Sequence, residues 1–113
     1  MTTHSMKLKA SPFSLIKRGD KTIEARLYDK KRERVQLGDT IVFHLMGDMN
    51  QTIEAKVVGL LRYETFGDMF AHNDVHKFGG DDAEAMAEQM LSYYDQAEQD
   101  MHGVIGIEFA VVI

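Results

Sequence analysis

The chain has 113 residues, of which 44% are hydrophobic and 27% are charged, and it contains one proline. These proportions are typical of one globular domain with a single core and exclude a disordered segment. The absence of cysteine excludes disulfide bonds, thiolate zinc sites, iron–sulfur clusters and a cysteine nucleophile. The net charge of −5 does not favour a protein that coats nucleic acid.

Charge is unevenly distributed along the chain. Residues 1–63 carry twelve Lys and Arg against seven Asp and Glu, whereas residues 64–102 carry ten acids against one base. This asymmetry predicts one face that attracts anions, and we interpret the acidic stretch as a solvated helical surface. The longest unbroken apolar run, Phe109 to Ile113, is too short to span a bilayer, and the first residues do not form a secretion signal. We therefore expect a soluble cytoplasmic protein with no membrane partner.

The first predicted elements are a strand and a helix. Residues 1–5 are expected to be a flexible N-terminus, followed by a first strand from Met6 to Lys9. Ser11 and Pro12 predict a helix start, with an N-cap hydroxyl and a proline at the first helical position. Gly19 predicts the end of this helix.

The middle of the chain predicts three strands. Thr22 to Leu27 alternates apolar and polar side chains, which is typical of a half-buried strand. A charged loop from Tyr28 to Gln36 leads towards an apolar strand from Thr40 to Leu45. Gly47 to Asn50 predicts a hairpin loop, and Thr52 to Tyr63 is long enough for an extended strand.

The last third of the chain predicts helices and a final strand. A short helix is expected from Thr65 to Ala71, and apolar residues at helical spacing predict a second helix from about Asp81 to Leu91. Gly103 to Ile113 predicts a mostly buried strand. Strands and helices do not alternate one for one, so the pattern favours an α+β fold with a mixed or antiparallel barrel over a doubly wound parallel sheet.

The residues that suggest chemistry lie around the start of the second strand. Glu24 and Arg26 are two residues apart, so their side chains project from the same face of a strand. Lys21 joins them only if the turn at Gly19 and Asp20 rotates its side chain to that face. Arginine can hold a phosphate through two hydrogen bonds, and glutamate can accept one from an amine or act as a base. The alternative interpretation is a surface ion pair worth less than about 1 kcal/mol.

The segment Gly19-x-Lys21-x-x-Glu24-x-Arg26 matches the G-x-K-x-x-E-x-R signature of the ASCH (activating signal cointegrator homology) family. The resemblance continues in segments on both sides of the signature and in the last strand. These similar segments are Phe13–Gly19, Leu27–Arg32, Val35–Phe43 and Gly103–Glu108. The chain therefore resembles an ASCH domain from Met6 onward, and we expect a single domain over residues 6–113.

The resemblance implies a small mixed β-barrel of the PUA-like type, with helices packed at its openings and a cleft that receives the signature. It implies a module that binds RNA or a nucleotide through Lys21, Glu24 and Arg26, and we expect no cofactor. Lys31 and Arg32 in the following basic loop are candidate phosphate contacts, with a solvated loop as the alternative interpretation.

The resemblance also suggests an enzymatic alternative, because one bacterial branch of the family hydrolyses acetylcytidine to cytidine and acetate. Lys21 matches the lysine of that branch, but Glu24 stands where the branch has a nucleophilic threonine. In a hydrolase of this kind, or in a ribonuclease, Lys21 is the candidate base and Glu24 the candidate base or nucleophile. Glu64, Asp74 and Tyr94 are candidates for a later side chain that reaches the cleft.

The remaining patterns have weaker functional interpretations. His72 and His76 have the spacing of helical metal ligands, but no glutamate follows the first histidine and Gly79-Gly80 comes soon after, so we expect no metal site. Tyr93 and Tyr94 are interpreted as core aromatics, or alternatively as a stacking surface for a base. The eight methionines are interpreted as core residues. A protein-interaction adaptor is a third function class, and the sequence leaves the oligomeric state unknown.

Overall fold

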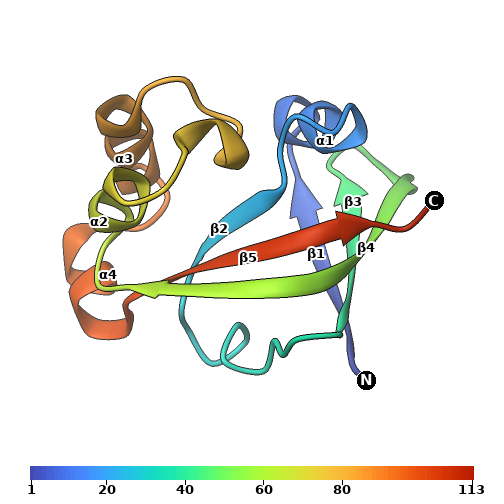
Figure 1. Cartoon of the computed structure of the whole chain (residues 1–113), viewed down its shortest axis with the longest axis horizontal. Helices are drawn as coiled ribbons and strands as arrows, with labels where there is room; N and C mark the ends of the chain where they lie inside the picture. The colour runs from blue at the N-terminus through green and yellow to red at the C-terminus, as the bar shows by residue number, and fades with distance from the viewer.

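A five-stranded mixed sheet forms the centre of the protein, which a computed structural model describes over all 113 residues (Figure 1). The strand order is β1-β3-β4-β5-β2, with β1 parallel to β3 and every other neighbouring pair antiparallel. The strands are β1 (Thr3–Leu8), β2 (Ile23–Leu27), β3 (Thr40–Leu45), β4 (Asp48–Tyr63) and β5 (Val104–Val111). The sheet curls into a half-barrel, which confirms the predicted α+β class with a mixed sheet.

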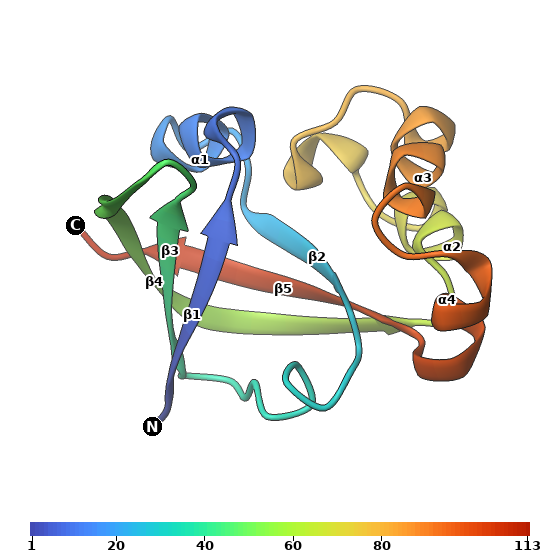
Figure 2. The same ribbon diagram turned by 180° about the vertical axis from the view of Figure 1, so that it is seen from behind.

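The helices form two groups (Figures 1 and 2). The first, α1 (Ala10–Lys17), lies at the end of the sheet where β1 and β3 finish. Three others gather at the far end of the long strands, where β4 ends and β5 begins: α2 (Phe66–Ala71), α3 (Ala83–Leu91) and α4 (Gln96–His102). The 3-10 helix η1 (Val75–Phe78) lies between this group and α1, beside β2. None of the helices is both long enough and apolar enough to cross a membrane.

The start of the chain differs from the sequence-based expectation. β1 begins at Thr3, so residues 3–5 pair with β3 where a flexible terminus was expected. The reason is Asp39, which accepts a hydrogen bond from Thr2 N at 3.2 Å and lies 2.9 Å from His4 Nε2. These contacts hold the chain ahead of Met6 against the start of β3.

Two further boundaries also differ. α1 begins at Ala10 with Lys9 as its N-cap, and no side chain caps it, so Ser11 lies inside the first turn. Pro12 is tolerated there because the first helical N–H groups have no acceptor within the helix. β4 begins at Asp48, so only two residues, Met46 and Gly47, separate it from β3. Gly47 has a φ of +94°, which a tight two-residue connection requires.

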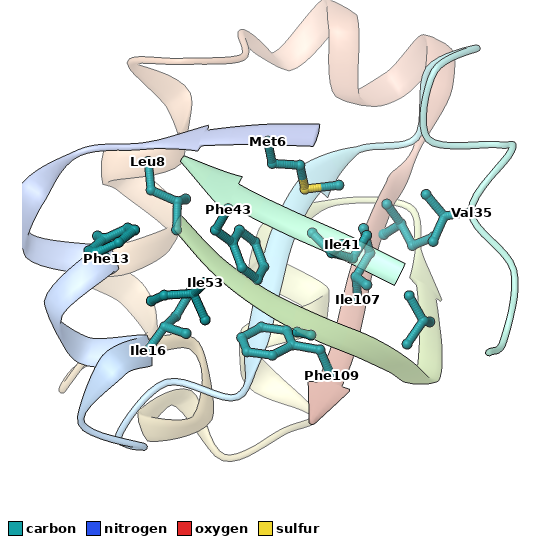
Figure 3. Packing of buried hydrophobic residues seen from close by; sticks show 13 residues of the cluster. Met6, Leu8, Phe13, Ile16, Val35, Ile41, Phe43, Ile53, Ile107 and Phe109 are labelled. Atoms are coloured by element: carbon teal, nitrogen blue, oxygen red, sulfur yellow. The ribbon is translucent and has the colours of Figure 1, made fainter. Parts of the chain in front are cut away.

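Two hydrophobic cores lie on opposite faces of the sheet. The barrel core fills the inside of the half-barrel beneath α1 and contains thirteen buried residues, including Ile105, Ile107 and Phe109 of β5 (Figure 3). The helical core contains seven buried residues and places Ile23 and Ala25 of β2 against α2 and η1. β2 is therefore covered on both faces, which makes the expectation of a half-buried strand wrong.

Candidate functional site

The pairing of β2 with β5 determines the direction of two signature side chains. Glu24 lies opposite Ile107 and Arg26 opposite Ile105 in the antiparallel ladder. Directly opposite residues share a face of the sheet, and both isoleucines belong to the barrel core. Glu24 and Arg26 therefore project into the half-barrel at its open side, and Glu24 is only 5% exposed.

The turn between α1 and β2 brings Lys21 to the same place. Gly19 has a φ of +85°, and Asp20 N donates to Leu15 O at 2.9 Å, which ends the helix with a Schellman turn. Lys21 N donates to the same carbonyl at 3.1 Å, and Thr22 N donates to Lys77 O of η1 at 2.8 Å. Lys21 therefore lies in the turn before β2 and does not follow the alternation of side chains along the strand. Its side chain can turn towards Glu24.

The signature side chains form one buried ion-pair cluster. Lys21 Nζ lies 2.9 Å from Glu24 Oε1, and Arg26 Nε donates to Glu24 Oε2 at 2.8 Å. Each carboxylate oxygen is therefore engaged by a different cation. Arg26 Nη2 also donates to Lys7 O at 3.1 Å, which links β2 to the free edge of β1.

The charges of this cluster stabilise one another. Burial on its own would raise the pKa of Glu24, but the charges and hydrogen bonds of Lys21 and Arg26 outweigh it and hold that pKa below its ordinary value. Burial on its own would lower the pKa of Arg26, but Glu24 and Tyr94 raise it. Glu24 is therefore a carboxylate at neutral pH, and the cluster carries two positive charges and one negative charge.

The cluster lies in a cleft with a volume of about 620 Å³ between the half-barrel and the helices. β1, α1, β2 and the β3–β4 hairpin contribute one side of this cleft, and η1, α3 and the residues after α3 contribute the other. Four cationic side chains line it against the single carboxylate of Glu24, although the whole chain has a net charge of −5. These cations are Lys7, Lys9, Lys21 and Arg26. The cleft thus has the opposite sign of charge to the protein.

The helical side of the cleft is largely apolar. Phe78 of η1, Met86 and Met90 of α3, and Tyr94 line it. Tyr94 stacks on the buried Phe66 with ring centroids 5.7 Å apart, so its expected core position is correct for this tyrosine. The cleft therefore combines a cationic side with an apolar, partly aromatic side.

Tyr93 lies at the rim of the cleft. Its side chain is 48% exposed, so the expectation of a core aromatic is wrong for this residue. Lys9 Nζ donates to the Tyr93 hydroxyl at 3.1 Å and lies 5.0 Å from the centre of its ring. The two side chains connect the half-barrel to the end of α3 across the rim.

Two predicted ligand contacts do not line the cleft. Lys31 is exposed, and Arg32 forms an ion pair with Asp29 at 2.7 Å. Both lie in the loop after β2, which runs along the end of the half-barrel opposite α1 (Figure 1). They remain candidate phosphate contacts only for a ligand that extends beyond the cleft.

Of the three candidates for a later side chain that reaches the cleft, Glu64, Asp74 and Tyr94, only one lines it. Tyr94 lines the cleft, whereas Glu64 lines a different hollow of about 540 Å³ between the end of β4 and α4. Asp74 is exposed and caps η1, where it also contacts His76. Thr22, which carries the one hydroxyl of the signature segment, is not among the residues that line the cleft.

The histidines do not form a metal site. His72 stacks on Tyr63 with ring centroids 5.8 Å apart, and His76 pairs with Asp74 at 3.0 Å. No group of three or more His, Asp or Glu side chains is arranged to hold a metal ion.

Sequence reasoning did not identify several cleft residues. Lys7, Lys9 and Gln89 line the cleft but belong to no recognisable motif. Gly79 could have been noticed in the sequence, because the Gly79-Gly80 pair interrupts the helical segment. It has a φ of +88°, and a Cβ there would lie 3.3 Å from Lys21 Cδ. The backbone at Gly79 thus packs closely against the stem of Lys21.

Comparison with known proteins agrees with the signature. The family model described as the ASCH domain matches residues 6–113. The chain is 30% identical to the hypothetical protein PH0355, with a TM-score of 0.87 over 98% of this chain and all of that one. It is 26% identical to protein PF0455 from Pyrococcus furiosus, with a TM-score of 0.75 over 98% of each chain.

A more distant structure extends the similarity of the fold. The ASCH protein from Zymomonas mobilis is 13% identical, with a TM-score of 0.65 over 96% of this chain and 67% of that one. No curated protein matches the sequence. The match of the family model over nearly the whole length, together with the half-barrel of PUA-like type, shows that this chain belongs to the ASCH domain family.

Proposed function

We propose that the cleft binds a nucleotide, either free or as part of an RNA strand, and that Lys21 and Arg26 hold its phosphate. The observation that carries this proposal is the buried cluster of two cations around one carboxylate. A lysine has three N–H donors and an arginine has five. Lys21 uses one contact and Arg26 two, so both have donors left for a phosphate in the cleft.

The rest of the cleft supports the same ligand class. Lys7 and Lys9 add positive charge near the opening, which favours an anion. The apolar side, with Tyr94 stacked on the helical core, offers a surface against which a base can pack. Glu24 positions the two cations, and its remaining lone pairs can accept a hydrogen bond from a hydroxyl of the ribose.

The geometry favours binding over hydrolysis. Attack on an amide requires a nucleophile and a base that can take its proton. The hydroxyl of Thr22 is outside the cleft, and the hydroxyls that line it, those of Ser11, Tyr93 and Tyr94, are not hydrogen-bonded to a carboxylate or an imidazole. Glu24 is an ion-paired carboxylate with a lowered pKa, which makes it a weak base. Lys21 could act as the base only after losing its own ammonium proton, and that loss would leave the buried Glu24 carboxylate with one cation fewer.

Thermal denaturation of the full chain with nucleosides, nucleoside 5′-monophosphates and short RNAs tests the proposal. A ligand at a hundred times its Kd stabilises a protein by about 2.7 kcal/mol, which corresponds to a rise in Tm of about 10 °C for a domain of this size. We expect such a rise with nucleotides and not with nucleosides. No rise with any phosphate-bearing member of the panel would refute the proposal.

A matched pair of lysine variants locates the binding. Lys7→Ala removes an exposed cation of the cleft, whereas Lys17→Ala removes an exposed cation of α1 outside it. Both substitutions should leave the free protein's stability within about 0.5 kcal/mol. We expect weaker nucleotide binding for Lys7→Ala and unchanged binding for Lys17→Ala, and equal effects would place the ligand elsewhere.

A further inference from the structure

The apolar stripe of α3 is incompletely covered. This helix has nine residues and none of them is buried, although Met86 and Met90 pack partly against the helical core. A helix of this length is marginal in water unless tertiary packing covers its apolar side. Because Met86 and Met90 also line the cleft, a ligand with an apolar body would complete their burial.

A third methionine faces the cleft from the opposite side. Met46 belongs to the β3–β4 hairpin, lines the cleft and is 51% exposed. Met6 and Met69 are buried in the two cores, as expected for core residues, but Met46, Met86 and Met90 are not. The unbranched thioether side chain adapts to different shapes and makes favourable contacts with aromatic rings. Binding surfaces rich in methionine are typical of proteins that accept several partners.

Most polar groups around these methionines already have partners. Glu24 is held by two cations, and the Tyr93 hydroxyl accepts a hydrogen bond from Lys9. Gln89 lines the cleft without a side-chain hydrogen bond in the chain. Its amide carries both donors and an acceptor, so it can pair with the edge of any base after a rotation. A site that distinguishes bases needs fixed polar groups that face the base. The fixed polar cluster of this cleft, formed by Lys21, Glu24 and Arg26, is the one that we assign to the phosphate and ribose.

We propose that the cleft is selective for the phosphate and for an aromatic base but does not distinguish among the four bases. The inference rests on the proposed nucleotide-binding function and specifies its ligand class. The cations Lys21 and Arg26 supply the phosphate selectivity. The three methionines on the two sides of the cleft, Met46, Met86 and Met90, accept purines and pyrimidines by changing rotamers.

Isothermal titration of the full chain with AMP, GMP, CMP, UMP and ribose 5-phosphate tests this inference. We expect the four nucleotides to have Kd values within about fivefold of one another, since no fixed polar group rejects any base. Ribose 5-phosphate should bind at least about tenfold more weakly, because it cannot cover Met86 and Met90.

Two double variants and a control separate the contribution of the methionines. The double variant Met86→Ala with Met90→Ala should weaken the binding of all four nucleotides by a similar factor, about tenfold. Its affinity for ribose 5-phosphate should be unchanged. The same positions changed to leucine keep the apolar area but lose the adaptable thioether, so the spread among the four Kd values should widen. Met101→Ala, on α4 outside the cleft, should change none of these values.

The outcomes distinguish this inference from the function on which it rests. A preference of more than about tenfold for one base, or ribose 5-phosphate binding as tightly as the nucleotides, would overturn base tolerance while nucleotide binding stands. Failure of all four nucleotides to bind would overturn the inference, and the proposed function falls with it if the short RNAs also fail to raise the Tm. Equal nucleotide affinities that fall together in the alanine variant would support the inference.

Discussion

At the scale of single residues, the two oxygens of Glu24 explain how a carboxylate can be buried at this position. An isolated buried carboxylate is strongly destabilising, and a single partner often does not compensate for the lost hydration. Here Lys21 and Arg26 engage one oxygen each, at 2.9 and 2.8 Å. The carboxylate in turn fixes the positions of both cations, so the cluster depends on all three side chains.

We predict that Lys21→Met destabilises the protein by about 2–3 kcal/mol, because it leaves the buried Glu24 paired with Arg26 alone. Urea unfolding measures this loss as a lower midpoint with an unchanged m value. Lys17→Met, an exposed lysine four residues earlier, should change the free energy of unfolding by less than about 0.5 kcal/mol. Similar midpoints for the two variants would show that the ion pair contributes little.

We also predict that the protein releases little or no cytidine from acetylcytidine. Glu24 is a carboxylate with a lowered pKa, and its attack on an amide would give a mixed anhydride that needs a strongly held oxyanion. Glu24→Thr should not install the activity, because it also removes the anion that holds Lys21 and Arg26 together. Chromatographic measurement of cytidine release decides this, and rapid turnover abolished by Glu24→Gln would establish the hydrolase.

At the scale of elements, the connection from α1 to β2 joins the signature to η1. Lys21 and Thr22 donate to backbone carbonyls of α1 and η1, and the stem of Lys21 packs beside Gly79. Gly79 ends η1 in the left-handed region, with a φ of +88°. The position of Lys21 therefore depends on two elements that are far apart in the sequence.

Gly79→Ala should reduce both stability and nucleotide affinity. The left-handed backbone costs about 1–2 kcal/mol with any Cβ, and here the Cβ would also crowd Leu15 Cδ1 at 3.1 Å and Lys21 Cδ at 3.3 Å. Gly47→Ala is a matched control, because it has a φ of +94° with nothing within 4 Å of its Cβ. Urea unfolding should show a larger loss of unfolding free energy for Gly79→Ala than for Gly47→Ala. Equal losses would show that the side chains of Leu15 and Lys21 move away from the new Cβ at no cost.

Some elements of the site could be predicted from the sequence and others could not. The alternation of β2 correctly placed Glu24 and Arg26 on one face, because register with β5 preserves that alternation. The helix from Gln96 to His102 was missed because its only apolar residues are Ala97 and Met101, although Asp95 and Glu98 form a capping box. Lys7 and Lys9 could not be assigned to the cleft, because only the curl of the sheet brings β1 near β2.

At the scale of the whole molecule, the half-barrel is held together at its open side by few contacts. β1 and β2 are the outer strands of the sheet and form no ladder with each other, so the cleft occupies the gap between them. Asp39 secures β1 from its other end through Thr2 N and His4, and Gln36 N in turn donates to the Asp39 carboxylate. Both the N-terminal strand and the cleft therefore depend on ionised carboxylates.

This arrangement predicts a loss of stability in acid. Hydrogen bonds from His4, Gln36 and Thr2 lower the pKa of Asp39 from 3.8 to about 2. Because the pKa is lower in the folded state, the contribution of Asp39 is complete above about pH 4 and is lost as the pH falls through about 2. Asp39→Asn should cost about 1–3 kcal/mol at pH 7 and progressively less towards pH 2, measured by urea unfolding. A difference that stays constant from pH 7 to pH 2 would contradict this account.

The overall charge predicts how RNA binds. The net charge of −5 repels a polyanion, and the cleft offers four cations against one carboxylate. For single strands, the logarithm of the binding constant falls by about 0.7 per contacted phosphate for each tenfold rise in salt concentration. The four cations of the cleft therefore support a slope of log K against log salt no steeper than about −3. We expect a Kd above about 1 μM at physiological salt, measured by titrating labelled RNA at several salt concentrations. Tight binding that is insensitive to salt would contradict the electrostatic argument. A slope steeper than about −3 would require phosphate contacts outside the cleft, for which the exposed Lys30 and Lys31 of the loop after β2 are the first candidates.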